Sequence, residues 1–399
     1  MSKLQELINK LCPNGVEFKP LGEVCEIKRG VRVVKQELEE FGDIPVFQNS
    51  LKPLGYYKLS NFKGFTSFVI GAGAAGEIGF SEKPFWAADD CFVIISNYLN
   101  DKYIFYCLQN NQLHLKRQVR KASIPRLSRV SIEKFMIPVP PIEVQEEIVR
   151  ILDSFSDYAA ELQAELQARK QQYEYYRNLL LTFNPSAYGC GTDDEQKDGV
   201  TTWGGHNYKI QWKKLGEIGN ICMCKRILKH QTNTKSGIPF YKIGTFGKVA
   251  DSYISEDLFM EYKKKYSFPQ KGEVLISASG TIGRAVIYDG EDAYFQDSNI
   301  VWINNDESMV LNKYLYYFYQ IVDWNVEGGT IKRLYNTNLS NTPIPIPPLE
   351  LQEKIVAILD RFETLVNDLT NGLPAEITAV KDQYEYYRNK LLTFKKLSA

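Results

Sequence analysis

The stretch YEYYRNLLLTF at residues 173–183 returns as YEYYRNKLLTF at residues 384–394, with a single substitution between the two copies. The copies lie about half a chain apart, and this spacing indicates an internal duplication rather than a short motif used twice. A chain of 399 residues is also too long for one typical hydrophobic core. The sequence therefore predicts two homologous halves, each with its own core.

Shorter repeats upstream of this stretch occur in the same order in both halves. QEEIVRILDSF at 145–155 matches QEKIVAILDRF at 352–362, and each copy follows a proline-rich segment, IPVPP or IPIPP. Three shorter matches lie further upstream: 19–24 with 213–218, 44–45 with 238–239, and 124–127 with 331–334. In the segments that separate these matches, the two halves share few identical residues. We therefore expect two modules that share a frame and recognise different things.

Apolar residues after each proline-rich segment follow the alternating steps of four and three that define a heptad seam. The seam covers residues 148–183 in the first half, with Arg169 as its one polar member, and residues 355–394 in the second. Two successive steps of four at 369–377 form a stutter beside Pro374, which lacks a backbone donor. The pattern predicts one long helix in the first half and a kinked or two-piece helix in the second.

The two helical segments, each about 58 Å long at 1.5 Å per residue, are expected to pack against each other antiparallel. The first contains a tandem tetrapeptide, AELQ-AELQ, at residues 160–167. One further unit would lengthen the helix by about 6 Å and rotate its end by about 40° beyond a full turn. The seam tolerates that change, whereas the separation between the modules does not. This favours an intramolecular spacer over the alternative, a coiled coil that only dimerises the protein.

The segment FVIGAGAAGEIGF at 68–80 contains the G-x-G-x-x-G pattern of a dinucleotide-binding turn. Such a turn must open a helix whose N-terminus holds the phosphate, whereas strand and turn residues at 84–86 soon follow here. Aligned by its Ile-Gly pair, the counterpart at 274–283 lacks the first two glycines. We interpret both segments as tight turns between strands, where backbone amides can approach a nucleic-acid backbone. The alternative, a nucleotide-dependent enzyme, requires that the isolated chain bind a cofactor.

The composition is that of an ordinary globular protein, with 44% hydrophobic and 24% charged residues. Forty-eight basic and 48 acidic residues balance, which argues against indiscriminate nucleic-acid binding but allows a local basic face. The seven cysteines lack paired spacing and only three histidines are present, so we expect reduced thiols, a cytoplasmic location and no metal site. Neither a signal peptide nor a membrane span is expected.

The two variable regions, the P-P-x-x-x-Q-E helix starts and the YEYYRN stretches together resemble the specificity subunit of type I restriction-modification enzymes, over essentially the whole chain. The resemblance implies an α+β fold with two tandem β-rich αβ target-recognition domains. Each domain is followed by a long helix, and the two helices pack as an antiparallel coiled coil with internal pseudo-twofold symmetry. Each domain would read one half of a bipartite, asymmetric target in double-stranded DNA, and the helices would set the spacer between the halves.

The resemblance also implies partners and a role without chemistry. The chain would assemble with two modification (methyltransferase) subunits, which carry S-adenosylmethionine, and with restriction subunits that translocate and cut DNA. No Asn-Pro-Pro-Tyr methyltransferase motif and no G-x-x-x-x-G-K-[ST] phosphate loop is present. We therefore expect neither a catalytic residue nor a cofactor in this chain, and no membrane partner.

Candidate DNA-binding residues come from clusters of basic residues. The segment 114–129 has six Lys or Arg and no acid, its counterpart beside Gly328 is sparser, and each module carries a Lys-Arg pair near its start. With one serine of the second glycine-turn segment, the predicted set is Lys28, Arg29, Lys116, Arg117, Arg120, Lys121, Arg126, Lys225, Arg226, Ser279, Lys332 and Arg333. Arg can bind guanine bidentately and Lys more often meets phosphate, and the sequence does not separate these roles.

Candidate partner-binding residues are two aromatic-arginine pairs that fall off the heptad seam, Tyr175 with Arg177 and Tyr386 with Arg388. Exposed pairs at repeated positions suit the docking of two copies of one partner. Helix packing inside this chain is the open alternative.

The expected domains follow from these patterns. They are target-recognition domain 1 (1–140), spacer helix 1 (141–183), a linker rich in Gly, Asp and Thr (184–206), target-recognition domain 2 (207–343), spacer helix 2 (344–394, kinked near 372–374) and a tail (395–399). The alternative function is a self-associating coiled-coil scaffold without DNA specificity, which would form concentration-dependent homodimers.

Overall fold

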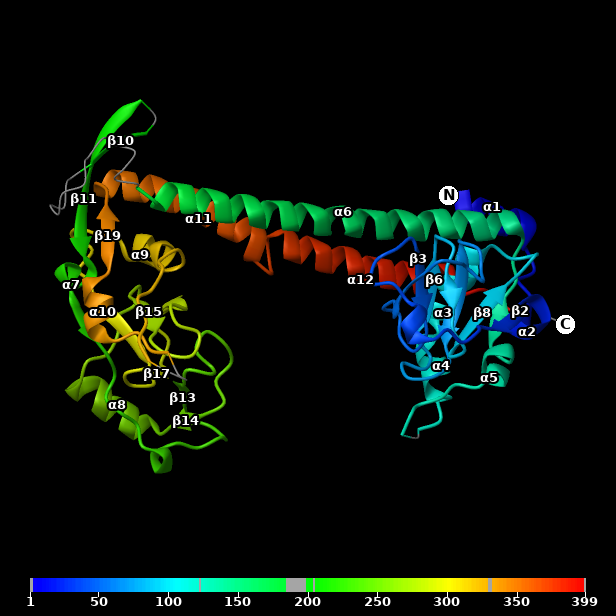
Figure 1. Cartoon of the computed structure of the whole chain (residues 1–399), viewed down its shortest axis with the longest axis horizontal. Helices are drawn as coiled ribbons and strands as arrows, with labels where there is room; N and C mark the ends of the chain where they lie inside the picture. The colour runs from blue at the N-terminus through cyan, green and yellow to red at the C-terminus, as the bar shows by residue number, and fades with distance from the viewer. Residues whose placement is uncertain (1–2, 122, 184–198, 204, 329–331, 398–399) are drawn as a thin grey trace. The chain divides into compact units, whose positions relative to one another are not determined.

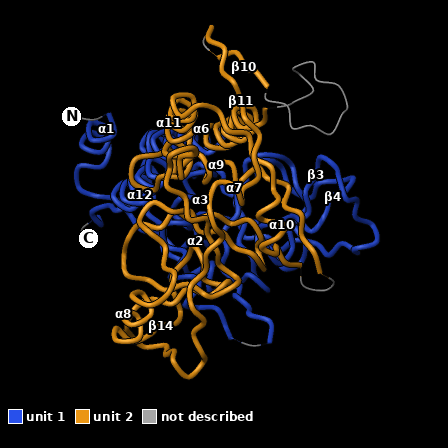
Figure 2. Tube along the Cα trace, turned by 90° about the vertical axis from the view of Figure 1, so that its left-hand side faces the viewer, with its two compact units in different colours: residues 1–164, 375–399 blue, residues 165–374 orange. Residues whose placement is uncertain are grey.

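A computed structural model describes residues 3–121, 123–183, 199–203, 205–328 and 332–397. The chain divides into two compact units, shown in two colours in Figure 2. Unit 1 comprises Met1–Ala164 with Ala375–Ala399, and unit 2 comprises Glu165–Pro374. Each unit therefore contains one predicted module and a part of each predicted helical segment.

Unit 1 contains a four-stranded antiparallel sheet and a smaller three-stranded one. The larger sheet has the order β2 (Glu26–Arg29), β8 (Cys91–Ile95), β5 (Thr66–Ile70), β6 (Ile78–Ser81). The smaller has the order β4 (Gly55–Tyr57), β3 (Ile44–Phe47), β7 (Trp86–Ala87), and β1 (Phe18–Pro20) pairs with β9 (Met136–Pro138). The helices are α1 (Lys3–Leu11), α2 (Leu21–Val24), α3 (Asp101–Asn110), α4 (Gln112–Arg117), α5 (Arg129–Glu133) and the first part of α6 (Ile142–Leu181).

Unit 2 repeats this topology and adds one strand, β10. Its larger sheet has the order β12 (Asn220–Cys222), β18 (Ile300–Asn304), β15 (Val274–Ser277), β16 (Ala285–Ile287). Its smaller sheets are β14 (Tyr253–Ile254), β13 (Ile238–Tyr241), β17 (Tyr294–Phe295), and β10 (Gly199–Trp203), β11 (His206–Lys214), β19 (Pro343–Ile346). The helices are α7 (Leu215–Ile218), α8 (Glu256–Lys265), α9 (Asn312–Tyr319), α10 (Asn336–Asn341) and α11 (Leu349–Asn367). The predicted α+β fold with two repeated modules is confirmed.

The first helical segment is one uninterrupted helix, α6, whereas the second is in two pieces, α11 and α12 (Leu373–Leu391) (Figure 1). The break lies at residues 368–372, where the Asp368 carboxylate accepts hydrogen bonds from the backbone of Thr370 and Asn371. Pro374 occupies the first turn of α12, where a missing backbone donor costs little. The interruption therefore precedes the proline and is not caused by a proline inside a helix.

The helices pack antiparallel within unit 1. The ring of Phe155 on α6 stacks on Tyr387 of α12, with 5.3 Å between ring centroids. One turn later on α6, the Tyr158 hydroxyl donates to the carboxylate of Glu376, which lies earlier on α12. In unit 2, Phe362 of α11 stacks on Tyr176 of α6 at 5.7 Å. The same pair of aromatic types thus joins the helices in both units.

The repeated P-P-x-x-x-Q motif has a structural explanation. Gln145 and Gln352 are almost completely buried, and each side-chain amide donates to the carbonyl of the first proline of its pair, at 2.7 Å. Each side-chain oxygen accepts a backbone N–H at the start of the module's own helix, from Asn100 before α3 or Leu311 before α9. The glutamine therefore ties the start of the long helix to the module that precedes it.

The predicted linker begins outside the described residues, because 184–198 is not among them. Residues 199–203 form strand β10, which pairs with β11 in a hairpin. The assignment of these residues to the linker is therefore wrong: it rested on their glycine and threonine content, whereas Val200, Thr201 and Thr202 are β-branched residues that favour strands.

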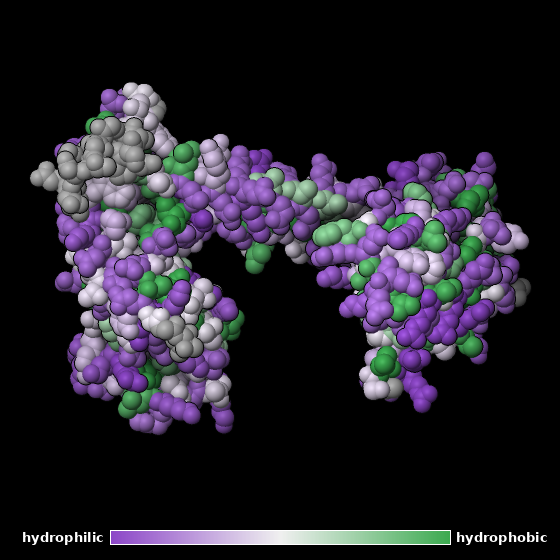
Figure 3. Space-filling view, in the orientation of Figure 1, coloured by the Kyte–Doolittle hydropathy of each residue, from purple (hydrophilic) through white to green (hydrophobic). Residues whose placement is uncertain are grey.

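The surface shows no sign of a membrane-spanning element among the described residues. None of the described helices combines the length and the apolar composition needed to cross a membrane. On the face shown in Figure 3, hydrophilic residues predominate and hydrophobic ones gather only in small separate groups.

Candidate nucleic-acid interface

The glycine segment of unit 1 connects β5 to β6, which pair antiparallel from Thr66–Ser81 to Val69–Ile78. It opens no helix, so the turn between strands is confirmed. The turn lies against the basic segment, because Leu127 N donates to Gly71 O at 2.8 Å and Gly73 N donates to Pro125 O at 3.2 Å. Two segments that are far apart in the sequence thus form one surface. We call the described residues of 71–77, 114–121 and 123–129 the turn–loop surface of unit 1.

Four glycines with positive φ shape the two turns: Gly73 (79°), Gly76 (84°), Gly280 (65°) and Gly283 (83°). The strand registers make Gly73 equivalent to Gly280 and Gly76 equivalent to Gly283. Our alignment by the Ile-Gly pair matched Gly283 with Gly79, three residues from its true counterpart, and was therefore wrong. Only Gly71 is replaced, by Ala278, because its φ is not positive and a side chain is allowed there in unit 2.

Basic side chains of unit 1 face solvent on the turn–loop surface. Five predicted DNA-binding residues are exposed, and none of them forms an ion pair within the described part of the chain: Lys116, Arg117, Arg120, Lys121 and Arg126. Arg129, by contrast, pairs with Glu133 on the same helix at 2.7 Å. Exposed cations without carboxylate partners are available to replace the counterions of a nucleic-acid backbone.

A hollow of about 460 Å³ extends this surface towards β2. It is lined by Arg29, Arg120 and Arg126 together with Asp89 and Asp90. Arg29 Nε donates to the main-chain oxygen of Asp89 at 2.6 Å, and one buried carboxylate oxygen of Asp89 has no partner among the described residues. The structure thus brings Arg29 to the basic loop.

The charge of Lys28, the neighbour of Arg29 on β2, is partly compensated by an ion pair with Glu26. Its ammonium lies 3.0 Å from the Glu26 carboxylate, and both side chains are about half exposed or more. The exposed pair is weak in water and leaves Lys28 able to exchange partners.

Unit 2 repeats the backbone of this surface with different side chains. Leu334 N donates to Ala278 O at 2.8 Å, which is the counterpart of the Leu127–Gly71 bond. Ser279 forms a β-bridge with Arg333, whose guanidinium donates to Ser298 O at 2.7 Å. We call the described residues of 278–284, 323–328 and 332–336 the turn–loop surface of unit 2. The predicted residues Ser279, Lys332 and Arg333 all belong to it.

The Lys-Arg pair of unit 2 does not take the place of the pair in unit 1. The registers of β2 and β12 against their neighbours align Arg29 with Met223, so Lys225 and Arg226 correspond to residues 31–32 of unit 1. Lys225 and Arg226 are exposed, and the Lys225 ammonium lies 5.1 Å from the ring of Tyr266. The two Lys-Arg pairs therefore occupy different positions in their modules.

Two residues of unit 2 that the sequence analysis missed belong to this surface. A Cβ atom at Gly283 would lie 2.4 Å from Trp324 Nε1, so this half-buried ring covers the second turn, much as the stem of Lys116 covers Gly76 at 3.1 Å. Arg284 directly follows the turn and donates to Phe246 O at 2.8 Å. A search for clusters of basic residues finds neither, because one is aromatic and the other is an isolated arginine.

The predicted partner-binding tyrosines are exposed at equivalent positions. Tyr175 is 63% exposed and Tyr386 is 59% exposed, each on the outer face of its helix. Large exposed aromatic rings at repeated positions are suited to burial in a protein interface.

The predicted partner-binding arginines pack inside their own units. Arg177 donates to Gln320 Oε1 at 3.0 Å, and its guanidinium lies 5.3 Å from the Tyr173 ring centroid. Arg388 lies 5.1 Å from the Tyr384 ring centroid in the same way. Both Nε atoms are buried without a partner among the described residues. Before any partner binds, Arg177 thus joins its helix to the module through Gln320, whereas Arg388 packs on a tyrosine of its own helix.

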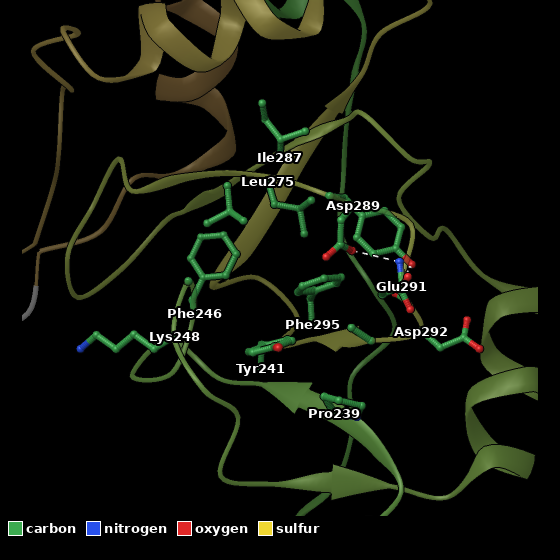
Figure 4. A pocket seen from close by; sticks show the side chains of 14 residues that line it. Pro239, Tyr241, Phe246, Lys248, Leu275, Ile287, Asp289, Glu291, Asp292 and Phe295 are labelled. Atoms are coloured by element: carbon green, nitrogen blue, oxygen red, sulfur yellow. Dashed lines mark hydrogen bonds between the residues drawn. The ribbon is translucent and has the colours of Figure 1, made fainter. Parts of the chain in front are cut away.

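A pocket of about 180 Å³ in unit 2 lies outside this surface (Figure 4). Its aromatic residues include Tyr241, Phe246 and Phe295. Its acidic residues are Asp289, Glu291 and Asp292, of which the last pairs with Lys263 at 3.0 Å. Three carboxylates repel phosphate, so we exclude this pocket from the candidate interface.

Comparisons of the sequence point to one family. A family model described as the type I restriction modification DNA specificity domain matches residues 13–169 and 208–379. A putative type I restriction enzyme specificity subunit of Haemophilus influenzae is 45% identical over 396 residues, which cover 95% of this chain and 96% of that protein. A type I restriction enzyme specificity subunit of Escherichia coli is 29% identical over 321 residues, 74% of this chain and 71% of that protein.

Solved structures share the fold. The S subunit of a type I restriction-modification system from M. genitalium gives a TM-score of 0.57 at 14% identity, covering 95% of this chain and 96% of that one. A chain from a study of complex assembly and conformational transition in a type I R-M system gives 0.58 at 18% identity, covering 96% and 98%.

Proposed function

The chain belongs to the specificity subunits of type I restriction-modification systems, and we propose that each unit reads one half of a two-part DNA target with its turn–loop surface. The single observation that carries this assignment is the repeat of one backbone frame with different side chains. Leu127 and Leu334 anchor equivalent loops to equivalent turns, while the exposed residues around them differ. Two related frames with unrelated surfaces suit an asymmetric target in double-stranded DNA.

The proposal makes the chain a non-catalytic component of a larger cytoplasmic assembly. It would work with two modification subunits, which bind S-adenosylmethionine and methylate the DNA, and in the full complex with restriction subunits. The exposed rings of Tyr175 and Tyr386 support two equivalent docking places, one in each unit. In this proposal the chain itself holds no cofactor.

The continuity of α6 supports a role of the helices in setting the target's spacer. The division between the units falls between Ala164 and Glu165, inside both this helix and the AELQ repeat. One added AELQ unit lengthens the helix by about 6 Å, and DNA rises about 3.4 Å per base pair. An extension of the helix by about 6 Å corresponds to at most about two base pairs of DNA. We therefore expect the spacer of the target to grow by about one to two base pairs, with both half-sites unchanged.

The experiment is a genome-wide map of methylated bases in the source organism, with the gene intact, deleted, or carrying one extra AELQ unit. Loss of one two-part motif on deletion supports the assignment, and a longer spacer with the same half-sites supports the role of the helices. An unchanged map after deletion, together with concentration-dependent homodimers of the purified chain, would instead favour the self-associating scaffold.

A further inference from the structure

The two turn–loop surfaces differ in charge although their backbones are equivalent. In unit 1, the segment 114–129 contains no acid, and five of its cations are exposed without an ion pair among the described residues. In unit 2, the segment 323–336 contains Asp323 and Glu327 as well as Lys332 and Arg333. The guanidinium of Arg333 is already bonded to Ser298 O at 2.7 Å. The turns add one anion to unit 1, Glu77, and one cation to unit 2, Arg284. The surface of unit 1 is therefore strongly basic, whereas that of unit 2 is only weakly basic.

One position shows the difference most directly. Arg120 exchanges two main-chain hydrogen bonds with Arg126, at 2.8 and 3.2 Å, and Glu327 exchanges the same two with Arg333, at 3.0 and 2.8 Å. Both side chains at this position are exposed. The fold thus places a cation in unit 1 and an anion in unit 2 at the same point of the same loop.

A second position repeats the contrast. Lys116 lies over Gly76 in unit 1, and the neutral ring of Trp324 lies over Gly283 in unit 2. Both glycines have positive φ in the turn that the loop covers. The side chain that covers the turn therefore adds charge to only one of the two surfaces.

Other charges do not reverse this difference. Asp89 and Asp90 line the hollow of unit 1, but Arg29, Arg120 and Arg126 line it too. In unit 2, Lys225 and Arg226 are exposed near the start of the module, and Lys242 is paired with Asp251 at 2.8 Å. Unit 2 therefore keeps a few cations, whereas unit 1 concentrates them around its turn.

We propose that unit 1 supplies most of the phosphate-binding charge and anchors the complex electrostatically, while unit 2 recognises its half-site through contacts that depend little on salt. This inference rests on the proposed function. Each phosphate neutralised by a protein cation contributes about 0.9 to the slope of log affinity against log salt concentration. The five exposed cations would therefore account for most of the slope, and long-range attraction would guide unit 1 to DNA first.

The test exchanges the charges at the equivalent position. The variants are Arg120→Glu in unit 1 and Glu327→Arg in unit 2, each assembled with the modification subunits. Binding to a duplex that carries the methylated motif is measured from about 50 to 200 mM salt, the range over which phosphate contacts change affinity strongly. Glu327→Gln is added because Glu327 Oε1 accepts a bond from Asn338 at 2.9 Å, which an amide oxygen preserves. Lys264→Glu, on the exposed surface of α8, controls for net charge.

We expect Arg120→Glu to lower the slope by about 1 to 2 and to weaken binding at low salt at least tenfold, through a lower association rate. Glu327→Arg should raise the slope by about 1, and Lys264→Glu should leave it unchanged. If Arg120→Glu leaves the slope unchanged, or if Arg120→Glu and Lys264→Glu lower it equally, unit 1 is not the anchor. If the wild-type complex binds its motif no better than other DNA, the proposed function itself fails.

Discussion

A single residue in the glycine turn shows how the duplicated frame adapts to different side chains. Gly71 N donates to Asp90 O at 2.6 Å, and a Cβ atom at Gly71 would lie 2.5 Å from the ring of Phe92. In unit 2 the equivalent residues are Ala278 and Val301, as the registers of β5 with β8 and β15 with β18 establish. In unit 2 the turn residue is thus larger, Ala in place of Gly, and its neighbour is smaller, Val in place of Phe.

We expect Gly71→Ala to destabilise unit 1 by about 1–3 kcal/mol, because the new methyl group overlaps the Phe92 ring. Adding Phe92→Val, which reproduces the pair of unit 2, should recover part of that loss. Urea denaturation of the three variants, followed by fluorescence, measures the coupling between the two positions. Strictly additive costs in the double variant would show that the ring is not the obstacle.

At the scale of residues, the sequence indicated which segments form the candidate surface, but it did not indicate how these segments contact each other. The basic segment and the glycine turn were both selected, yet only the structure shows the Leu127–Gly71 bond that joins them. The alignment of the turn failed because identity of letters favoured the Ile-Gly pair, whereas positive φ fixes the true equivalence. Trp324 was missed because its place over Gly283 depends on a contact that no local pattern encodes.

At the scale of elements, the heptad seam predicted the helices and the repeats predicted the modules. The start of each long helix follows from the buried glutamine of the P-P-x-x-x-Q motif, whose partners lie about 40 residues away. The short strands were less predictable because many have only two to four residues, too few for a clear alternation. Strand β10 was assigned to the linker for a different reason, the glycine and threonine content of its sequence.

One buried carboxylate contributes to the docking of α1 on α6, beside the apolar contacts of Leu4. Glu147, whose side chain is 3% exposed, accepts hydrogen bonds from Arg150 at 2.6 Å and from Lys3 of α1 at 2.8 Å. The hydrogen bond from Arg150, followed by that from Lys3, lowers the pKa of Glu147 to about 2. Since the unfolded chain binds this proton more tightly, the stabilisation is complete above the unfolded pKa of about 4.3 and is lost as pH falls towards 2.

We therefore expect Glu147→Gln to lower the free energy of unfolding of unit 1 by about 1–2 kcal/mol at pH 7. The difference from the wild type should shrink below about pH 4 and vanish only below about pH 2, where the wild-type carboxyl is protonated as well. Urea titrations at a series of pH values measure this difference. Glu146→Gln, on the exposed face of the same turn, is the matched control and should show no such pH dependence. A difference that stays constant with pH would mean that charge is not the cause.

At the scale of the whole molecule, the unit boundaries differ from the boundaries of the sequence repeat. Each repeat ends with its own helix, but α12 from the end of the second repeat belongs to unit 1. Tyr384 donates to Gln109 of α3, and Leu392 is buried in the core of that unit. Val16 and Lys395 join near the two ends of the chain through a main-chain bond of 2.8 Å. The first module is therefore completed by residues from the end of the second repeat.

This arrangement predicts that removal of residues 375–399 unfolds the first module, although these residues belong to the second sequence repeat. Unit 1 would lose the α12 side of its core and the strand contact at Val16, while every residue of unit 2 would remain. Hydrogen exchange of the truncated chain should show lost protection in β5 and β8 of unit 1 and retained protection in β15 and β18 of unit 2. Unit 2 is thus the internal control. Native protection of β5 and β8 in the truncated chain would mean that the first module folds without α12, and that the C-terminal helix contributes nothing to its core.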